Sequence, residues 1–284
     1  MTNQPELEFT GERFTPECVR EIAYEHWHRY AWAAQLVKGK QVLDAACGEG
    51  YGSYLLSREA AHVTAVDIDQ TTIDHALRRY AGTNIEFRQA DCTKLPLDDD
   101  SVDVVVSFET LEHLAEQDQL LAQFRRVLRS DGFLLVSSPD KKTYSDETGY
   151  DNPFHVRELY RDEFEDLLGR HFPAFRLFGQ KLMFVSALWA LDGPGQCESL
   201  MTDGNRLVAG PHPQLPPLYF LAVAAADQDF LPTTRALSLF GDREESVYQH
   251  YNDEIRNHIR AGKLLAERDA EIARLRALLE QSQQ

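Results

Sequence analysis

The sequence is poor in cysteine, in long apolar runs and in basic residues. Its 284 residues include only four cysteines, which are Cys18, Cys47, Cys92 and Cys197. They are too scattered for a zinc ribbon or a redox pair, and the chain has neither an H-E-x-x-H motif nor a carboxylate-rich calcium loop. We find no convincing set of metal ligands, and metal dependence stays open.

The longest apolar stretches are residues 182–191 and 218–226, and both are too short to cross a bilayer. The first residues lack the basic region and apolar core that a signal peptide needs. We therefore expect a cytoplasmic, soluble protein with no transmembrane segment.

Basic residues are outnumbered, with 29 Lys and Arg against 46 Asp and Glu and a formal net charge of -17. Nucleic-acid binding depends largely on neutralising phosphates with Lys and Arg, so no nucleic-acid partner is expected. An acidic protein holds a cationic ligand more readily than an anionic one.

Strand and helix patterns alternate regularly between residues 41 and 139. We expect strands at 41–46, 62–66, 84–89, 102–107 and 133–137, and helices at 51–60, 70–80 and 114–128. Such alternation predicts a parallel sheet with helices on both faces. Further strands are expected at 174–178 and 218–225, and a further helix at 162–168.

The chain divides into three expected parts. Residues 1–40 form an N-terminal arm and a cap helix, which begins at Thr15-Pro16-Glu17 and runs to about Val37. The core stripe expected on this helix is Ile22, Trp27, Tyr30, Ala34 and Val37. Residues 41–240 form the main domain, with a Gly/Pro-rich insertion at about 188–216, and residues 241–284 form a long C-terminal helix.

The segment from Asp44 to Gly52 is the most informative in the sequence. A buried strand ends near Asp44, and Gly48, Gly50 and Gly52 follow before a helix. Glycine permits a sharp turn and close approach of a ligand to the backbone. The dinucleotide fingerprint would need a glycine where Ser53 stands, which disfavours a dehydrogenase. The spacing instead resembles motif I of the class I S-adenosylmethionine-dependent methyltransferases.

Neighbouring motifs strengthen this resemblance over residues 40–140. Asp67 ends the second strand, where an acid can accept hydrogen bonds from ribose hydroxyls, and Asp91-Cys92 follows the third. Ser107 to His113 follows the fourth strand. The resemblance implies a Rossmann-like, doubly wound α/β fold whose seven-stranded sheet contains one antiparallel strand.

The resemblance also implies S-adenosylmethionine as cofactor. Gly48 and Gly50 would face its methionine part, Asp67 its ribose and Ile68 its adenine. Arg13 would meet its carboxylate, although an ion pair with a nearby glutamate is an equally good interpretation. The full set of expected cofactor residues is Arg13, His28, Asp44, Gly48, Glu49, Gly50, Asp67, Ile68, Asp91, Cys92, Ser107 and Glu109.

Methylation of an unactivated hydroxyl needs a base, and two histidines are candidates. His155, in the polar loop after the fifth strand, is the first choice and His113 the second; a structural role for His155 stays open. Glu109 would hold the cofactor or orient His113, and Glu112 is expected to be solvated. The expected substrate-binding residues are Tyr24, Asn152 and Arg157.

The segments at 11–17 and 152–157 resemble a bacterial subgroup associated with polysaccharide and O-antigen synthesis. This implies an O-methyltransferase acting on a sugar hydroxyl of a nucleotide sugar, a lipid-linked glycan or a surface polysaccharide, where methylation can end the chain. Leu265, Ile272 and Leu279 lie seven residues apart and suggest a coiled coil. It would mediate self-association or contact with a glycosyltransferase at the inner membrane. The alternatives are a methyltransferase for a phenol, quinone or natural product, and a non-catalytic scaffold.

Overall fold

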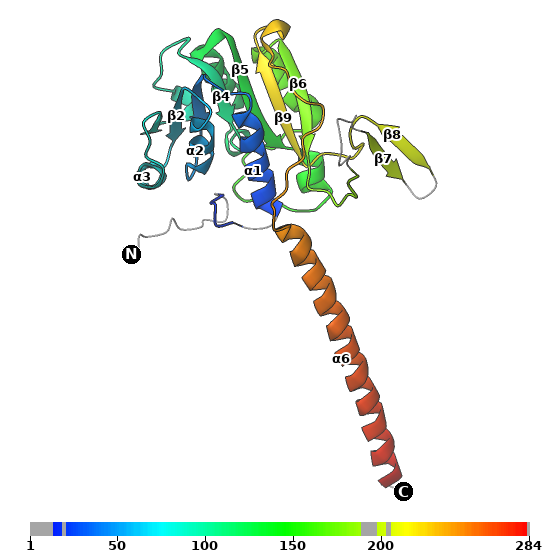
Figure 1. Ribbon diagram of the computed structural model, residues 1–284. Helices are drawn as coiled ribbons and strands as arrows, with labels where there is room; N and C mark the ends of the chain where they lie inside the picture. Colours follow the sequence, from blue (N-terminus) through cyan, green and yellow to red (C-terminus); the bar gives the residue numbers. More distant parts are fainter. Residues whose placement is uncertain (1–13, 19–20, 189–197, 203–205, 283–284) are drawn as a thin grey trace. The chain divides into compact units, whose positions relative to one another are not determined.

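The computed structural model describes residues 14–18, 21–188, 198–202 and 206–282. Its contacts divide the chain into two compact units, Met1–Leu239 and Phe240–Gln284. The first unit contains a seven-stranded sheet in the order β3-β2-β1-β4-β5-β9-β6 (Figure 1). Its strands are β1 (Gln41–Ala45), β2 (His62–Asp67), β3 (Ile85–Gln89), β4 (Val102–Ser107), β5 (Leu128–Pro139), β6 (Ala174–Gln180) and β9 (Tyr219–Ala225).

Strand β9 is antiparallel to both of its neighbours, β5 and β6, whereas the pairs among β1 to β5 are parallel. The predicted Rossmann-like sheet with one antiparallel strand is therefore confirmed. The parallel pairing also brings the carboxyl ends of β1, β2 and β4 to one edge, since Asp44 pairs with Ala65 of β2 and Val106 of β4. In folds of this kind that edge holds the ligand.

Helices cover both faces of the sheet. One apolar core joins sheet residues such as Val42 and Val106 to helices α1 (Glu21–Ala34), α2 (Tyr51–Ser57) and α3 (Gln70–Arg79). The opposite core joins residues such as Leu43 and Val105 to α4 (Gln117–Val127) and α5 (Arg161–His171). Adjacent strand residues point to opposite faces, so Val42 and Leu43 enter different cores.

The N-terminal helix begins later than expected. Pro16 and Glu17 form a turn rather than a first helical turn, and α1 begins at Glu21 and ends at Ala34. Thr15 contacts the Cys18 sulfur instead of capping a helix. Phe14 stacks on the ring of His26, with 4.5 Å between the ring centroids. These local contacts hold the segment in its turn.

The buried face of α1 also differs from the expected apolar stripe. Ile22 is 38% exposed, whereas the charged residues Glu25 and Arg29 are buried together with Tyr30 and Ala33. Buried charges need partners, so this face indicates a functional site rather than a plain core contact.

The insertion contains a feature that the sequence did not predict. Strands β7 (Ser199–Thr202) and β8 (Leu207–Gly210) pair as a small antiparallel hairpin. Short helical turns complete the first unit: η1 (Cys92–Lys94), η2 (Leu111–His113), η3 (Lys142–Asp146) and η4 (Gln228–Phe230).

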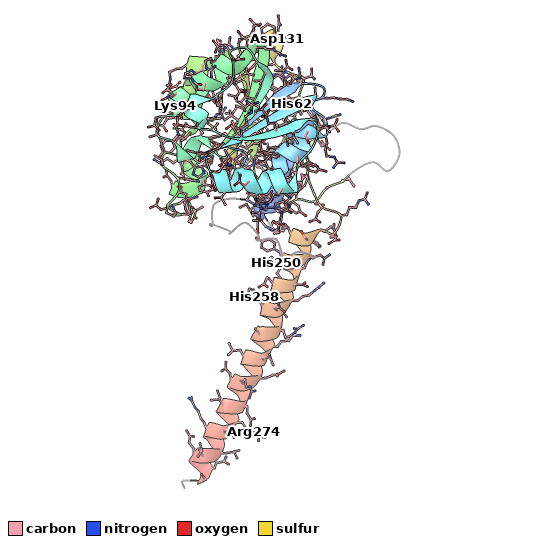
Figure 2. The ribbon with its side chains drawn as sticks, turned by 90° about the vertical axis from the view of Figure 1, so that its left-hand side faces the viewer. His62, Lys94, Asp131, His250, His258 and Arg274 are labelled. Carbon is pink, nitrogen blue, oxygen red and sulfur yellow. The ribbon has the colours of Figure 1, made fainter. Side chains whose placement is uncertain are left out.

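The second unit is one helix, α6 (Ser246–Ser282), with 37 residues. At 1.5 Å per residue it is about 55 Å long. Leu265, Ile272 and Leu279 are each about half exposed, at 65%, 48% and 59%. Figure 2 shows the labelled side chains of His258 and Arg274 projecting from this helix. Within the described ranges, no helix has both the length and the apolar character needed to cross a membrane.

Candidate cofactor and acceptor site

The turn after β1 has an unusual backbone. Ala46 has φ 60°, Gly48 has φ 54° and Gly50 has φ 96°. A Cβ on Gly50 would lie 2.8 Å from the Cβ of Ala76 on α3. Positive φ and close packing together require glycine at position 50. The turn leaves backbone amides at the amino end of α2, where an anionic or polar ligand group can bind.

The third glycine has a different purpose. A Cβ built on Gly52 would overlap the ring of Tyr30 on α1. Gly52 therefore allows α1 and α2 to pack closely, and this packing covers the glycine turn from the side of the N-terminal helix.

Asp67 lies beside the glycine turn at the end of β2. Its Oδ2 accepts a hydrogen bond from the Gly48 amide at 2.9 Å, and its Oδ1 accepts one from the Asp69 amide at 3.0 Å. Each carboxylate oxygen has a second lone pair, which suits the two hydroxyls of a ribose. The neighbouring Ile68 is 70% exposed, as expected for a side chain that a ligand ring would cover.

Asp91 and Cys92 form the next part of this edge. The Asp91 carboxylate accepts hydrogen bonds from the Thr93 amide and hydroxyl at 2.8 and 2.7 Å, which lowers its pKa. Burial raises the pKa of the Cys92 thiol to about 12. Cys92 is therefore a neutral thiol rather than a nucleophile, and it suits the packing role beside a ligand.

Two carboxylates expected on the cofactor contact residues of neighbouring helices. Asp44 is fully buried and accepts hydrogen bonds from Ser53 of α2 and Tyr30 of α1 at 2.5 and 3.2 Å. Burial raises its pKa to about 7. Glu49 accepts a hydrogen bond from Tyr80 at 2.8 Å and lies 2.9 Å from Nε2 of His75. These contacts help to position the glycine turn, and the cofactor roles expected of both residues stay predictions.

A buried ion pair, which sequence reasoning missed, lies at the end of β4. Arg29 of α1 is 1% exposed, and its Nη1 lies 2.5 Å from Oε1 of Glu109. Its guanidinium also lies over the ring of Tyr219, 4.7 Å from the centroid. Glu109 has φ 51°, which is uncommon for a residue other than glycine. The signal in the sequence was a pair of opposite charges, Glu25 and Arg29, four residues apart in a helix rich in aromatic residues and alanine.

Ser137 of β5 fixes the conformation of Glu109. Its hydroxyl accepts a hydrogen bond from the Glu109 amide at 3.0 Å and donates one to Oε1 at 2.6 Å. Among the described residues, Nη2 of Arg29 and the hydroxyl of the fully buried Ser107 have no hydrogen-bond partner. These polar groups at the β4 end fit a ligand that carries a carboxylate, as the methionine part of S-adenosylmethionine does.

The remaining residues expected near the cofactor lie on or before α1. Nε2 of His28 lies 2.9 Å from the Ser238 hydroxyl, and burial lowers the histidine pKa. Tyr24 is half-buried. Arg13 lies outside the described residues.

His113 and His155 meet next to the β4 end. Their ring centroids are 5.1 Å apart. His155 Nδ1 lies 2.6 Å from Oε1 of Glu158, and its Nε2 lies 3.0 Å from Nδ2 of Asn152. Tyr144 stacks on His155 at 5.4 Å. The structure thus brings the two base candidates together and places Asn152 against His155, whereas the side chain of Arg157 is exposed.

The expectation that Glu112 is solvated is wrong. Its side chain is fully buried rather than solvated. Its backbone carbonyl accepts hydrogen bonds from the amides of Val156 and Arg157 at 2.8 and 3.0 Å. The loop that carries His155 therefore folds over the turn that carries Glu112 and excludes water from it.

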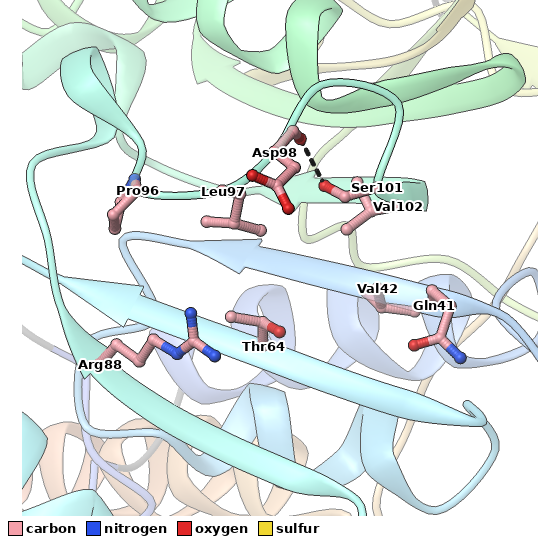
Figure 3. A pocket seen from close by; sticks show the side chains of 9 residues that line it. All are labelled: Gln41, Val42, Thr64, Arg88, Pro96, Leu97, Asp98, Ser101 and Val102. Atoms are coloured by element: carbon pink, nitrogen blue, oxygen red, sulfur yellow. Dashed lines mark hydrogen bonds between the residues drawn. The ribbon is translucent and has the colours of Figure 1, made fainter.

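A separate pocket of about 230 Å³ lies between the loop at Pro96 to Ser101 and sheet residues that include Thr64 and Arg88 (Figure 3). None of the residues expected to hold the cofactor or the acceptor lines it. We therefore build the candidate site on the glycine turn and the ends of β2 and β4.

Comparisons with known proteins agree with this geometry. Residues 43–136 match the methyltransferase domain family. A probable S-adenosylmethionine-dependent methyltransferase of Mycobacterium tuberculosis is 43% identical over 167 residues, which are 57% of this chain and 60% of that protein. The phthiotriol/phenolphthiotriol dimycocerosates methyltransferase of Mycobacterium leprae is 30% identical over 171 residues, covering 54% of this chain and 63% of that protein.

A solved structure shares the fold. It is a methyltransferase from Thermotoga maritima described as a possible histamine N-methyltransferase, with a TM-score of 0.51 and 13% identity. The match covers 72% of this chain and 90% of that one. The chain spans about 60% of the length of the mycobacterial relatives. Residues 43–136 thus match a methyltransferase domain, and S-adenosylmethionine is the cofactor that this match indicates.

Proposed function

We propose that the protein transfers a methyl group from S-adenosylmethionine to a hydroxyl of a sugar or glycan. The observation that carries the proposal is the meeting of three features at one sheet edge. These are the glycine turn after β1, the doubly hydrogen-bonded Asp67 after β2 and the half-buried His113 and His155 pair beyond β4. Because β1 lies between β2 and β4, the donor and acceptor groups would lie side by side.

In this proposal, Asp67 accepts hydrogen bonds from the ribose and Arg29 binds the carboxylate of the cofactor. The cofactor supplies an electrophilic methyl on a sulfonium. The C–O bond forms as the C–S bond breaks, and the hydroxyl proton passes to an imidazole of the His113 and His155 pair. Glu158, 2.6 Å from His155, would stabilise the resulting positive charge.

Exposed side chains of the loop support a sugar acceptor. Tyr150 and Phe154 are 53% and 46% exposed beside Asn152, so the loop offers aromatic faces and polar groups together. Sugars present both apolar and hydroxyl-bearing surfaces, which such a loop can contact. A lipid hydroxyl is the second candidate, because the relative from Mycobacterium leprae is named for lipid substrates.

The acceptor class can be tested with labelled S-adenosylmethionine. The full chain is incubated with nucleotide sugars, lipid-linked glycans, long-chain lipid alcohols and phenols, and labelled products are separated. Transfer to a glycan supports the proposal, whereas transfer only to lipids or phenols contradicts the sugar acceptor. Cofactor binding without transfer to any acceptor would favour a non-catalytic scaffold.

The His155→Ala substitution should affect methyl transfer to a sugar hydroxyl and to a phenol differently. A sugar hydroxyl needs a base, so activity should fall at least about 100-fold while cofactor binding is retained. A phenol loses its proton more readily than a sugar hydroxyl, so the variant should methylate a phenol at much of the original rate. Unchanged turnover of the sugar would contradict a base role for His155.

We also propose that α6 mediates self-association or binds a glycosyltransferase partner. Its three leucine and isoleucine side chains at seven-residue spacing are about half exposed, which suits a coiled-coil seam. A cytoplasmic location, or attachment to the inner membrane through such a partner, would follow.

A further inference from the structure

Glu112, His113 and His155 form a cluster that the sequence did not predict. One ligand atom from each residue lies within 4.8 Å of the others. Glu112 and His113 belong to the η2 turn after β4, whereas His155 belongs to the distant polar loop. No short sequence motif could reveal a set assembled from two such separate segments.

The histidines have the outer contacts that metal ligands usually have. Nδ1 of His113 lies 3.0 Å from the carbonyl oxygen of Phe154, and Nδ1 of His155 lies 2.6 Å from Glu158. A ligating histidine commonly donates its second ring N–H to a carbonyl or carboxylate, which fixes the ring and its tautomer. Both rings would therefore direct Nε2 at the ion.

The third ligand is a fully buried carboxylate. Glu112 is 0% exposed, and its backbone carbonyl accepts hydrogen bonds from the amides of Val156 and Arg157. These bonds attach the His155 loop to the η2 turn, so the three ligands are held together by the fold. Beside the two imidazoles, this buried carboxylate would supply one negative charge toward a divalent cation.

We propose that Glu112, His113 and His155 bind one divalent transition-metal ion, Zn²⁺ or Fe²⁺. Two imidazoles and one carboxylate are a donor set that both ions accept, with coordination positions left open. Tetrahedral ligand atoms at metal distances of about 2.1 Å are about 3.4 Å apart, so distances within the cluster must shorten by up to about 1.4 Å. The Asn152 amide, 3.0 Å from Nε2 of His155, would turn away.

The catalytic use of this ion rests on the proposed function, but its binding does not. An ion at an open position lowers the pKa of a hydroxyl that binds to it. The hydroxyl proton would then pass to water rather than to a histidine. The ion would thereby replace the imidazole base as the activating group for methyl transfer.

Metal binding can be measured without turnover. The full chain is stripped with EDTA and titrated with Co²⁺, whose bound form absorbs visible light, and Zn²⁺ or anaerobic Fe²⁺ is then added to displace it. We expect one Co²⁺ per chain and displacement by one of the two ions. Glu112→Gln and His113→Ala should each weaken binding at least 100-fold. His171→Ala, a histidine beside Asp118 outside the cluster, is the matched control and should bind normally.

The outcomes separate this inference from the proposed function. Absence of stoichiometric Co²⁺, Zn²⁺ and Fe²⁺ binding, or equal binding by the Glu112→Gln and His113→Ala variants, overturns the metal site. Binding of S-adenosylhomocysteine reports whether each variant is folded. Full methyl transfer by the stripped enzyme in EDTA overturns the catalytic use of the ion and leaves the proposed function intact. Metal binding with no transfer to a sugar supports the site and rejects the sugar acceptor.

Discussion

Asp67 shows how one residue acquires a role from its position. It ends a central strand, and two backbone amides fix its carboxylate without exhausting its capacity to accept hydrogen bonds. Motif spacing predicts that an acid at this place binds a ribose. Asp44 and Glu49 have the same chemistry nearby, but hydroxyls and charges of adjacent helices surround them.

The Asp67→Ala substitution should weaken S-adenosylhomocysteine binding by about 100-fold, since two hydrogen bonds to the ribose are lost at about 1.4 kcal/mol each. Calorimetry measures the effect. Asp74→Ala, on the exposed side of α3, is the control and should bind like the unmodified chain. Equal affinities for the Asp67→Ala variant and the unmodified chain would show that this carboxylate does not face the ligand.

Asp44 makes stability depend on pH. Its pKa is raised to about 7 by burial, while an unfolded aspartate has a pKa of about 3.9. Between these values the folded state holds a proton that the unfolded state has lost, so the free energy of unfolding falls as pH rises from about 4 to 7. Above pH 7 this decrease in the free energy of unfolding is complete, and its upper bound is about 4 kcal/mol.

Urea unfolding across this pH range measures the decline. Asp44→Asn keeps a hydrogen-bond acceptor for Ser53 and should flatten the decline. Glu25, whose pKa burial also raises to about 7, should still contribute a slope in that variant. An unchanged slope in the Asp44→Asn variant would show that Asp44 ionises normally.

At the scale of elements, helix α1 differs most clearly from what the sequence predicts. Its existence followed from the sequence, but its start and buried face did not. Phe14 and Thr15 make local contacts with His26 and Cys18, and the helix begins only at Glu21. Buried Arg29 pairs with Glu109 of a strand end far along the chain. Periodicity records apolar faces, so it cannot identify a buried charge whose partner lies on another element.

The sheet and the glycine turn were predictable because local signals determine them. Strand β1, its three glycines and Asp67 follow one another within a single strand–helix–strand unit. The Glu112, His113 and His155 cluster was not predictable, because it depends on how a long loop folds over η2. The same reason explains why Glu112 was wrongly expected to be solvated.

The Glu109→Gln substitution should destabilise the fold by about 3 kcal/mol, because it leaves the Arg29 guanidinium buried without its carboxylate. Urea unfolding provides the measurement. Combining it with Arg29→Met should recover much of the loss, as expected when two residues act as a pair. Additive losses in the double variant would argue against a coupled ion pair.

At the scale of the whole molecule, the two units differ in kind. The first unit has two apolar cores and the candidate site, whereas α6 has only Val247 buried among its described residues. A long helix with exposed apolar residues is rarely stable alone, so a partner or a second copy is the natural way to cover them.

The Ile272→Glu substitution tests the proposed seam of α6. A charge at a coiled-coil core position should lower the association constant at least about 10-fold, as measured by analytical ultracentrifugation or partner capture. Arg274→Glu changes charge on the same helix outside the seven-residue series and serves as the control. Equal effects of both substitutions would mean that charge alone, not the seam, governs association.

The most direct test of the central claim is calorimetry of the full chain with S-adenosylhomocysteine and, separately, with a nicotinamide dinucleotide. Gly50→Ala serves as the variant, because a Cβ there would press on Ala76. We predict one S-adenosylhomocysteine bound per chain, no dinucleotide binding, and binding by Gly50→Ala weakened at least about 10-fold. A chain that is folded but binds only the dinucleotide, or neither compound, would contradict the account.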